Sequence, residues 1–379
     1  MIQPIEQYDG FNISFHVTED CNLRCKYCYE LEKKKNDLPL EYAKRFIELI
    51  IDDPDPVGVK GTKEEYLLNK GLILDFIGGD ALMKPDLCEE IIKYFIFYST
   101  LKNHRWSKNW RISISTNGTL FNDRVKEFLM KWKDVISLGI SIDGCPEIHN
   151  LNRSGSMPAI MKEWNWYYKF TNGNPTTKAT LTNESIPYIY ESVTFLHEVL
   201  KINYIYMNFI FEKQETEPDL VELGNQLELT CQYVLKHKDD LYLSLFDKDM
   251  KNGKPMQDPD KGWCGSGAMP CLDIDGKIYP CFRFCSQNMS KGVEPLVVGD
   301  IEKGLYNKEV FSLIRSKTRG VISEEKCMNC DVESSCAWCI AGGYGETGEL
   351  CRQTYICEVN KVQDKWAKEY WRLYNGINR

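Results

Sequence analysis

Three features are missing from this 379-residue sequence. It has no run of the ~18–20 apolar residues that a membrane-spanning helix needs. Its first 20 residues carry acidic side chains and lack the basic and apolar parts of a signal peptide. With a net charge of −8, it also lacks the basic excess typical of proteins that bind nucleic acids. These absences predict a cytoplasmic protein with no membrane and no nucleic-acid partner.

One short segment of this acidic chain is locally basic. Lys33, Lys34 and Lys35 follow one another, and such a run is predicted to be a solvated loop. Internal repeats and low-complexity tracts are also missing. A hydrophobic content of 43% supports an ordinary globular core, and the length suggests two or three domains.

What the sequence has in excess is cysteine, with 16 residues. A large cytosolic protein keeps its thiols reduced, so clustered cysteines favour metal sites over disulfides. Most of them lie from Cys264 to Cys357, among many glycines and other turn residues. This segment is therefore expected to fold around metal more than around an apolar core.

Short apolar segments alternate with helical patterns over the first two-thirds of the chain. The predicted strands cover residues 11–17, 72–77, 111–115, 135–142, 176–182 and 204–211. The predicted helices cover residues 39–51, 86–102, 121–132, 156–170, 186–200 and 217–236. The alternation predicts an α/β fold, a partial (β/α)6 TIM-like barrel whose functional groups lie at the carboxyl ends of the strands.

The pattern also predicts where the parts of the chain begin and end. Residues 1–236 form the partial barrel, with an insertion at 52–70, and residues 237–263 form a bridging region rich in glycine and proline. Residues 264–379 form a small cysteine-rich α+β domain, closed by an amphipathic helix at 358–374.

The first cysteine motif follows the first predicted strand directly. Cys21, Cys25 and Cys28 have the spacing C-x3-C-x2-C, with Tyr27 before the third cysteine. Three thiolates from one loop bind three irons of a cubane and leave the fourth iron open for chemistry. The alternative is a zinc loop that lacks one ligand.

This motif resembles that of the radical S-adenosylmethionine (SAM) superfamily, and the resemblance continues through residues 11–211. It implies that the open iron chelates SAM. One electron then cleaves SAM to methionine and a 5′-deoxyadenosyl radical, which abstracts hydrogen from the substrate. The expected catalytic residues stay unknown.

The resemblance also implies which residues hold SAM at the strand ends. Asp80 would bind the amino group, the segment 115–117 would face the ribose and methionine, and the segment 141–144 with Arg153 would contact the carboxylate. The expected cofactor-binding residues are Tyr27, Gly78, Gly79, Asp80, Ser115, Asn117, Ser141, Asp143 and Arg153.

The later cysteines are numerous enough for two metal sites, of iron or of zinc. Their pattern resembles the SPASM extension of radical SAM enzymes, which holds two auxiliary 4Fe–4S clusters and would bring the total to three. The resemblance implies that auxiliary cluster I uses Cys264, Cys271, Cys281 and Cys339. It implies that auxiliary cluster II uses Cys327, Cys330, Cys336 and Cys357.

Two features depart from the SPASM pattern. Two residues separate Cys336 from Cys339, where the family usually has three. Cys351 also lies near Cys357 and competes for the last ligand position, for which Cys357 is preferred. The unassigned cysteines are predicted to be mostly buried thiols, with Cys285, four residues after a ligand, as the one to watch: Cys88, Cys145, Cys231, Cys285 and Cys351.

Enzymes with this extension mostly modify peptides or proteins. The chain looks most like maturases of cysteine-repeat peptides, which implies a thioether crosslink formed on a ribosomally made peptide. The alternative is an anaerobic sulfatase-maturing enzyme, which makes formylglycine with an Asp after the cysteine of Gly-x4-Cys. Here Phe282 and Arg283 follow Cys281, although Asp273 or Asp275 could replace that carboxylate. A non-catalytic iron–sulfur or zinc scaffold is the third possibility.

The expected partners follow from this resemblance. They are a peptide or protein substrate and an external electron donor of the flavodoxin or ferredoxin type. Many peptide maturases carry a leader-binding domain, for which the 20 residues before Cys21 leave no room. Substrate capture is therefore expected at the barrel mouth, the insertion, the bridging region or a separate leader-binding protein.

Overall fold

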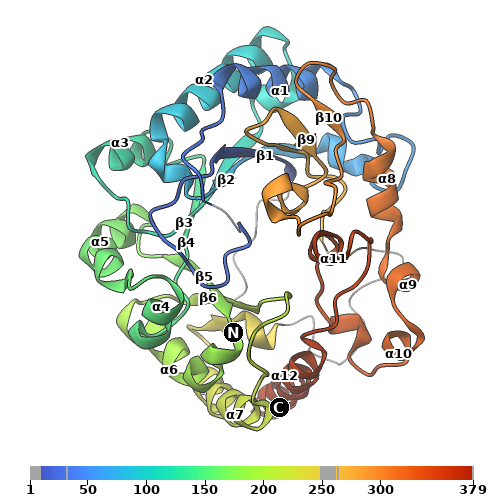
Figure 1. Cartoon of the computed structure of the whole chain (residues 1–379). Helices are drawn as coiled ribbons and strands as arrows, with labels where there is room; N and C mark the ends of the chain where they lie inside the picture. The colour runs from blue at the N-terminus through green and yellow to red at the C-terminus, as the bar shows by residue number, and fades with distance from the viewer. Residues whose placement is uncertain (1–9, 31–32, 248–261, 263, 378–379) are drawn as a thin grey trace.

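A computed structural model of the chain describes residues 10–30, 33–247, 262 and 264–377. Six parallel strands run side by side in chain order around one side of the molecule (Figure 1). They are β1 Gly10–Thr18, β2 Gly71–Gly78, β3 Trp110–Thr116, β4 Ile136–Ile140, β5 Thr176–Leu181 and β6 Tyr204–Phe209. Each predicted strand is confirmed, and the fold class is the predicted α/β fold with a parallel sheet.

Helices cover the outer face of this sheet (Figure 1). They are α1 Leu40–Asp52, α2 Pro85–Leu101, α3 Asp123–Lys131, α4 Pro146–Asn152, α5 Met157–Phe170, α6 Ile189–Thr194 and α7 Leu220–Lys236. The sequence did not predict α4. The helix predicted at 186–200 is divided into a 3-10 segment, Asn183–Tyr188, then α6, and a π-helical turn, Phe195–Val199.

The two faces of the strands differ in chemistry because side chains alternate along a strand. Phe15, Phe76 and Ile114 face the helices and are almost fully buried. On the opposite face the neighbouring positions are polar, and Ser14 Oγ donates to Asp75 Oδ2 at 3.2 Å. Polar side chains such as Ser14 and Asp75 therefore lie on the inner face of the sheet.

The cysteine-rich segment extends the same sheet with short strands. β8 Cys271–Leu272 pairs in parallel with β1, and β9 Lys277–Tyr279 pairs in antiparallel with β8 and with β10 Gly299–Asp300. At the other edge β7 Tyr242–Leu243 pairs with β6. The predicted boundaries near 236 and 264 stay a prediction, and most of the bridging region lies outside the described residues.

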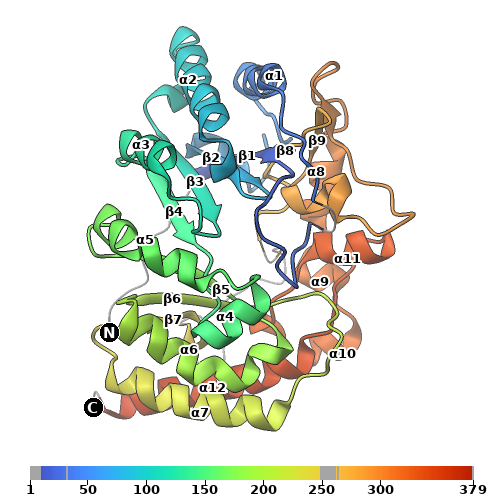
Figure 2. The same cartoon turned by 60° about the vertical axis from the view of Figure 1, so that its left-hand side comes forward.

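The helices of this segment reach the far edge of the sheet (Figure 2). They are α8 Glu309–Ser316, α9 Arg319–Ile322, α10 Glu325–Met328, α11 Ile340–Thr347 and α12 Cys357–Ile377. The predicted C-terminal helix is confirmed as α12, which packs along α7. Trp371 Nε1 donates to the carbonyl oxygen of Phe246 at 3.1 Å, and the ring of Tyr370 stacks on that of Phe246. The segment thus contacts both edges of the sheet.

The insertion at 52–70 packs against the cysteine-rich segment. Arg315 Nη1 donates to the carbonyl oxygen of Val57 at 2.8 Å, and Lys308 forms an ion pair with Asp53. Val57 and Val59 are fully buried. The insertion therefore ties the barrel to α8. Among the described helices, none combines the length and the apolar character that crossing a membrane requires.

Candidate functional site

The loop with the first cysteine motif lies at the carboxyl end of β1. Cys21 is buried, and Cys25 and Cys28 are half-buried. Burial raises the pKa of Cys21 and of Cys25, while the positive charges of Lys33 and Arg153 oppose that rise. Lys33 Nζ donates to Cys28 Sγ at 3.1 Å. Three thiols from one loop with cations beside them fit the anionic ligand set of an iron–sulfur cluster.

The Gly78-Gly79-Asp80 segment holds this loop in place through its backbone. Gly79 N donates to the carbonyl oxygen of Thr18 at 2.8 Å, and Asp80 N donates to that of Asp20 at 3.0 Å. A Cβ atom at Gly79 would lie 2.0 Å from the carbonyl oxygen of Asp20. Only glycine allows the end of β2 to approach the cluster loop this closely.

The carboxylate of Asp80 is buried and already has partners within the protein. It accepts hydrogen bonds from Asn117 N at 2.8 Å, Thr116 Oγ1 at 2.9 Å and Leu82 N at 3.1 Å. Burial raises the pKa of Asp80, and these hydrogen bonds oppose the rise. Asp80 therefore fixes the end of β3 beside the cluster loop, and its predicted contact with the SAM amino group stays a prediction.

Three predicted residues meet next to Cys25. The Tyr27 hydroxyl donates to Asp143 Oδ2 at 2.6 Å, and Arg153 Nε lies 3.0 Å from Asp143 Oδ1. The guanidinium group of Arg153 lies over the Tyr27 ring, 5.3 Å from its centroid, and Arg153 Nη1 lies 4.0 Å from Cys25 Sγ. Burial and the charge of Asp143 raise the pKa of Tyr27, so its hydroxyl stays protonated. The resulting ion pair places a guanidinium group next to the cluster loop.

The remaining predicted residues lie at the same strand ends. Asn117 Nδ2 donates to Asn22 Oδ1 at 2.8 Å and lies 3.9 Å from Cys21 Sγ. Ser115 is exposed on the inner face of β3, and Ser141 N donates to the carbonyl oxygen of Thr116 at 2.9 Å. The structure thus gathers the predicted SAM-binding residues around the cysteine loop, although their contacts with SAM stay predictions.

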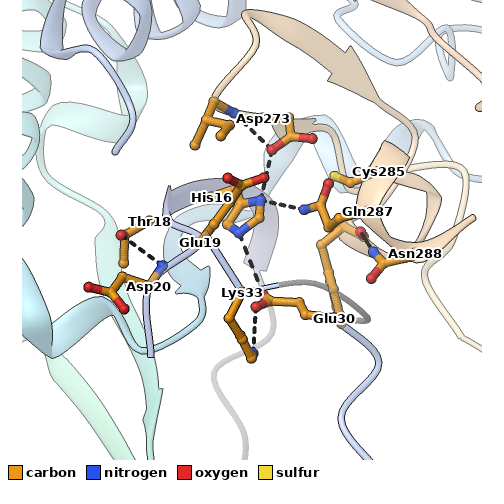
Figure 3. A network of polar contacts seen from close by, with 12 residues as sticks. His16, Thr18, Glu19, Asp20, Glu30, Lys33, Asp273, Cys285, Gln287 and Asn288 are labelled. Atoms are coloured by element: carbon orange, nitrogen blue, oxygen red, sulfur yellow. Dashed lines mark hydrogen bonds and ion pairs between the residues drawn. The ribbon is translucent and has the colours of Figure 1, made fainter. Parts of the chain in front are cut away.

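A buried chain of charges joins the cluster loop to the cysteine-rich segment (Figure 3). His16 in β1 lies between two carboxylates, with Nδ1 at 2.7 Å from Asp273 Oδ1 and Nε2 at 3.5 Å from Glu30 Oε1. Glu30 Oε2 accepts a hydrogen bond from Lys33 Nζ at 2.7 Å. Burial favours the neutral ring, but the hydrogen bonds to Asp273 and Glu30 raise the pKa of His16 to about 10. His16 thus links the two regions, and Gln287 Nε2 lies 2.5 Å from the same Nδ1.

Sequence reasoning missed this network and was wrong about Lys33. Lys33 was predicted to lie in a solvated loop, but its side chain is only 7% exposed, because Glu30 and Cys28 bind its ammonium group. Lys34 and Lys35 are exposed, as predicted. A signal for His16 was present: it occupies an inner-face position of a strand that leads directly into the cysteine motif.

The cysteines assigned to auxiliary cluster I lie around Cys281. Burial raises the pKa of Cys281, and the neighbouring thiols of Cys264 and Cys339 raise it further. Cys271 lies beside Cys285, with 3.8 Å between the two Sγ atoms, and both Cys271 and Cys281 raise the pKa of Cys285. Cys285 is therefore a fifth thiol near this group. Cys88, Cys145, Cys231 and Cys285 are buried, as predicted.

The cysteines assigned to auxiliary cluster II surround the start of α12. Burial raises the pKa of Cys357, and the charges of Cys336 and Cys327 raise it further, so these three thiols are neighbours. Cys336 Sγ accepts a hydrogen bond from Asn360 Nδ2 at 3.0 Å. Cys351 lies elsewhere, against Thr347 Oγ1 at 3.6 Å. The positions favour Cys357 as the fourth ligand.

The position after Cys281 carries no acid–base group. Phe282 contacts the Tyr29 ring, with 5.5 Å between the ring centroids, and Arg283 forms an ion pair with Glu212. Asp273 is engaged by His16, and Asp275 lies 3.4 Å from Lys277 on an exposed turn. Neither aspartate takes the place of the carboxylate that formylglycine chemistry is expected to need.

Comparison with known proteins places this site in a family context. Residues 15–167 match the Radical SAM superfamily. An uncharacterised protein of Methanocaldococcus jannaschii, MJ0907, is 30% identical over 195 residues, which are 50% of this chain and 59% of that protein. A cysteine-type anaerobic sulfatase-maturating enzyme of Clostridium novyi is 25% identical over 350 residues, which are 83% of each chain.

Solved structures match almost the whole chain. The structure of anSMEcpe with bound AdoMet and the Cp18Cys peptide aligns with a TM-score of 0.69 and 16% identity, over 97% of this chain and 99% of that one. Streptococcus suis SuiB bound to its precursor peptide SuiA aligns with a TM-score of 0.58 and 18% identity, over 92% and 76%. The predicted resemblance is confirmed: residues 15–167 match the Radical SAM superfamily, and the chain, including its cysteine-rich region, shares the fold of these solved structures.

Proposed function

We propose that this protein is a radical SAM peptide maturase that forms a thioether crosslink in a ribosomally made peptide. The observation that carries the proposal is the environment of Cys281. The next residue is Phe282, and the nearby Asp273 is bound to His16, so neither position offers a free carboxylate to deprotonate a substrate hydroxyl or thiol. A thiol that is already ionised needs no such base.

The residues that would hold the cofactors are those described above. The first 4Fe–4S cluster would bind to Cys21, Cys25 and Cys28, and the auxiliary clusters would bind to the later cysteines. With SAM bound, the first cluster supplies a 5′-deoxyadenosyl radical. Tyr27 and Arg153, fixed by Asp143, give the cofactor pocket a hydroxyl and a cation whose positions are set before SAM binds.

The proposed reaction balances as a loss of two hydrogens from the peptide. One hydrogen atom leaves a substrate carbon and ends in 5′-deoxyadenosine. The substrate thiol loses its proton to solvent, the carbon–sulfur bond forms, and one electron leaves the substrate. An acceptor of the flavodoxin or ferredoxin class would take this electron, and a donor of the same class would supply the electron that cleaves SAM.

The test is to incubate the reconstituted protein, SAM and a reductant with a cysteine-containing precursor peptide encoded beside the gene. The expected product is 2 Da lighter than the peptide, and its crosslinked cysteine resists alkylation. An unchanged peptide mass, with 5′-deoxyadenosine still formed, would contradict thioether formation on that peptide.

A second candidate is formylglycine formation on a sulfatase. It is favoured by one specific observation, the alignment over nearly the full length of anSMEcpe and over 83% of a sulfatase-maturating relative. The Cp18Cys peptide bound in the anSMEcpe structure is a suitable probe. An aldehyde that a hydrazine reagent traps in that peptide would establish this candidate and overturn the thioether proposal.

A further inference from the structure

A group of metal-binding side chains lies apart from the thiol sites, where α6 and α7 end. His197 belongs to the π-helical turn that follows α6, and His237 and Asp240 follow α7. One ligand atom from each of the three residues lies within 4.8 Å of the other two. Two of the protein's five histidines and one aspartate therefore meet at the ends of these two helices.

The distances in this group resemble those around a bound metal ion. His197 Nε2 lies 3.6 Å from Asp240 Oδ2, and His237 Nδ1 lies 3.7 Å from Asp240 Oδ1. In a tetrahedral zinc site with bonds of about 2.0–2.2 Å, neighbouring ligand atoms are about 3.3–3.6 Å apart. Small side-chain rotations would therefore complete the geometry.

The hydrogen bonds around His197 show which nitrogen carries a lone pair. The Tyr233 hydroxyl donates its only proton to Glu198 Oε1 at 3.0 Å. Its oxygen lies 2.8 Å from His197 Nδ1, so it accepts a hydrogen bond from that nitrogen. In the neutral ring, Nε2 then has no proton and directs its lone pair at a carboxylate oxygen of Asp240. A metal ion between this lone pair and the Asp240 carboxylate would satisfy both.

The surroundings of His197 favour a metal ion over a proton. Its side chain is only 9% exposed, and its Nδ1 is occupied by the Tyr233 hydroxyl oxygen at 2.8 Å, which leaves Nε2 facing Asp240. Neutral imidazole is the form that binds metals. The Tyr233–Glu198 pair fixes the ring in the way that outer-shell hydrogen bonds orient metal-binding histidines.

We propose that His197, His237 and Asp240 bind one divalent transition-metal ion of the zinc class. The ligand set of two imidazoles and one carboxylate suits such an ion better than Ca²⁺ or Mg²⁺, which prefer oxygen. The site lies where the chain enters β6 and β7, whereas the cysteine loop follows the carboxyl end of β1. Because these strands are parallel, the two sites lie at opposite ends of the sheet. The ion would therefore have a structural role and would connect the π-helical turn to the end of α7.

The test uses the full chain with its iron–sulfur clusters reconstituted, so that cysteines do not compete for the added metal. The protein is incubated with Zn²⁺, freed of unbound metal by gel filtration, and examined for zinc and iron content and by zinc X-ray absorption. We expect about one zinc per chain with a nitrogen and oxygen shell at about 2.0–2.1 Å and no sulfur at about 2.3 Å.

Substitutions assign that zinc to its ligands. Asp240→Asn and His237→Gln change the more exposed ligands, so folding is preserved, and each should abolish retention of the zinc. Asp239→Asn, a neighbouring carboxylate outside the site, should retain it, and iron content should be unchanged throughout. Tyr233→Phe should weaken zinc binding by about 10–100-fold, because it removes the group that fixes the His197 ring.

Three outcomes would overturn the proposal. They are an absence of bound zinc in the wild-type protein, zinc with a sulfur shell, and a nitrogen and oxygen shell that persists in the Asp240→Asn and His237→Gln double variant. None of these measurements depends on the peptide substrate, so the result is independent of the proposed maturase function.

Discussion

The partial barrel and the cysteine-rich segment hold their cysteines in different ways. In the barrel, Cys21 follows a strand of nine residues, and backbone hydrogen bonds from Gly79 and Asp80 fix its loop. In the cysteine-rich segment, β8 and β10 have two residues each, and most of the thiols lie in loops and short turns.

This difference suggests different roles for metal in the two regions. The strands and helices of the barrel contribute most of an extensive apolar core, and the first site lies at the end of a strand that this core holds. Apart from α12, the cysteine-rich segment has only short strands and short helices, so metal ligation should contribute much of its folding free energy. Each prediction below either removes metal from one region or breaks a contact between the two.

The largest effect is expected when the first site is removed. The Cys21→Ala, Cys25→Ala and Cys28→Ala triple variant should lose all reductive cleavage of SAM, because only this loop leaves an iron open. It should retain about two-thirds of the iron. The assay is 5′-deoxyadenosine by mass spectrometry. Formation of 5′-deoxyadenosine in the triple variant would disprove the assignment.

Removal of auxiliary metal should affect only the cysteine-rich segment. In the Cys327→Ala and Cys357→Ala double variant, amide hydrogen exchange around α10 and α11 should become roughly a hundredfold faster, because ligation stabilises this segment. Exchange in β1–β4 should be unchanged and serves as the internal control. Equal loss of protection in both regions would mean that the cysteine-rich segment does not depend on metal more than the barrel does.

The buried charge chain between the regions should contribute to stability in a pH-dependent way. His16→Gln leaves Asp273 without its cation and Glu30 with Lys33 alone, and should lower the unfolding free energy by about 3–5 kcal/mol near neutral pH. Because the pKa of His16 is raised from 6.5 to about 10, the stabilisation is complete below pH 6.5 and is lost as pH rises through 10.

The measurement is denaturant unfolding of wild-type protein and variant from pH 6 to pH 10, with His104→Gln as a control outside the network. The difference between wild type and His16→Gln should shrink toward pH 10. A difference that is independent of pH would mean that His16 is not the cation in this chain.

A smaller effect is expected from Asp80. Asp80→Ala should weaken SAM binding by about 1.5–3 kcal/mol, the scale of a hydrogen bond to a charged group. Part of that loss should come from the end of β3, since Asp80 binds Thr116 and Asn117. Calorimetric titration of the reconstituted protein with SAM measures this loss. An unchanged SAM affinity would show that Gly78-Gly79-Asp80 is only a turn.

The smallest effect is expected from Cys351. Cys351→Ala should keep the full iron content, because this thiol lies against Thr347, whereas Cys357 neighbours Cys336 and Cys327. Cys357→Ala, the matched variant, should lose about four irons. If Cys351→Ala lost about four irons and Cys357→Ala kept the full iron content, Cys351 would be the ligand instead of Cys357.

Local patterns predicted much of this fold. The apolar segments located all six strands because their outer-face residues, such as Phe15 and Phe76, form the core. The helix predicted at 186–200 was less accurate, since Pro187 and the π-helical turn divide it. Short motifs at the strand ends also predicted which residues gather around the first cysteine loop.

Contacts between distant parts of the chain could not be predicted. His16 and Asp273 are 257 residues apart, and nothing local to either residue indicates the other. Lys33 appears in the sequence as part of a basic run, and only the folded chain places Glu30 and Cys28 beside it. From the sequence, Asp80 was expected only to bind the amino group of SAM. In the structure its buried carboxylate accepts hydrogen bonds from Thr116 and Asn117.

The number of clusters in each region is tested most directly by the iron and acid-labile sulfide content of the anaerobically reconstituted protein. One cluster in the barrel and two in the cysteine-rich segment predict about twelve irons and about twelve sulfides per chain. A value near four irons, or zinc bound to sulfur in the cysteine-rich segment, would contradict the account.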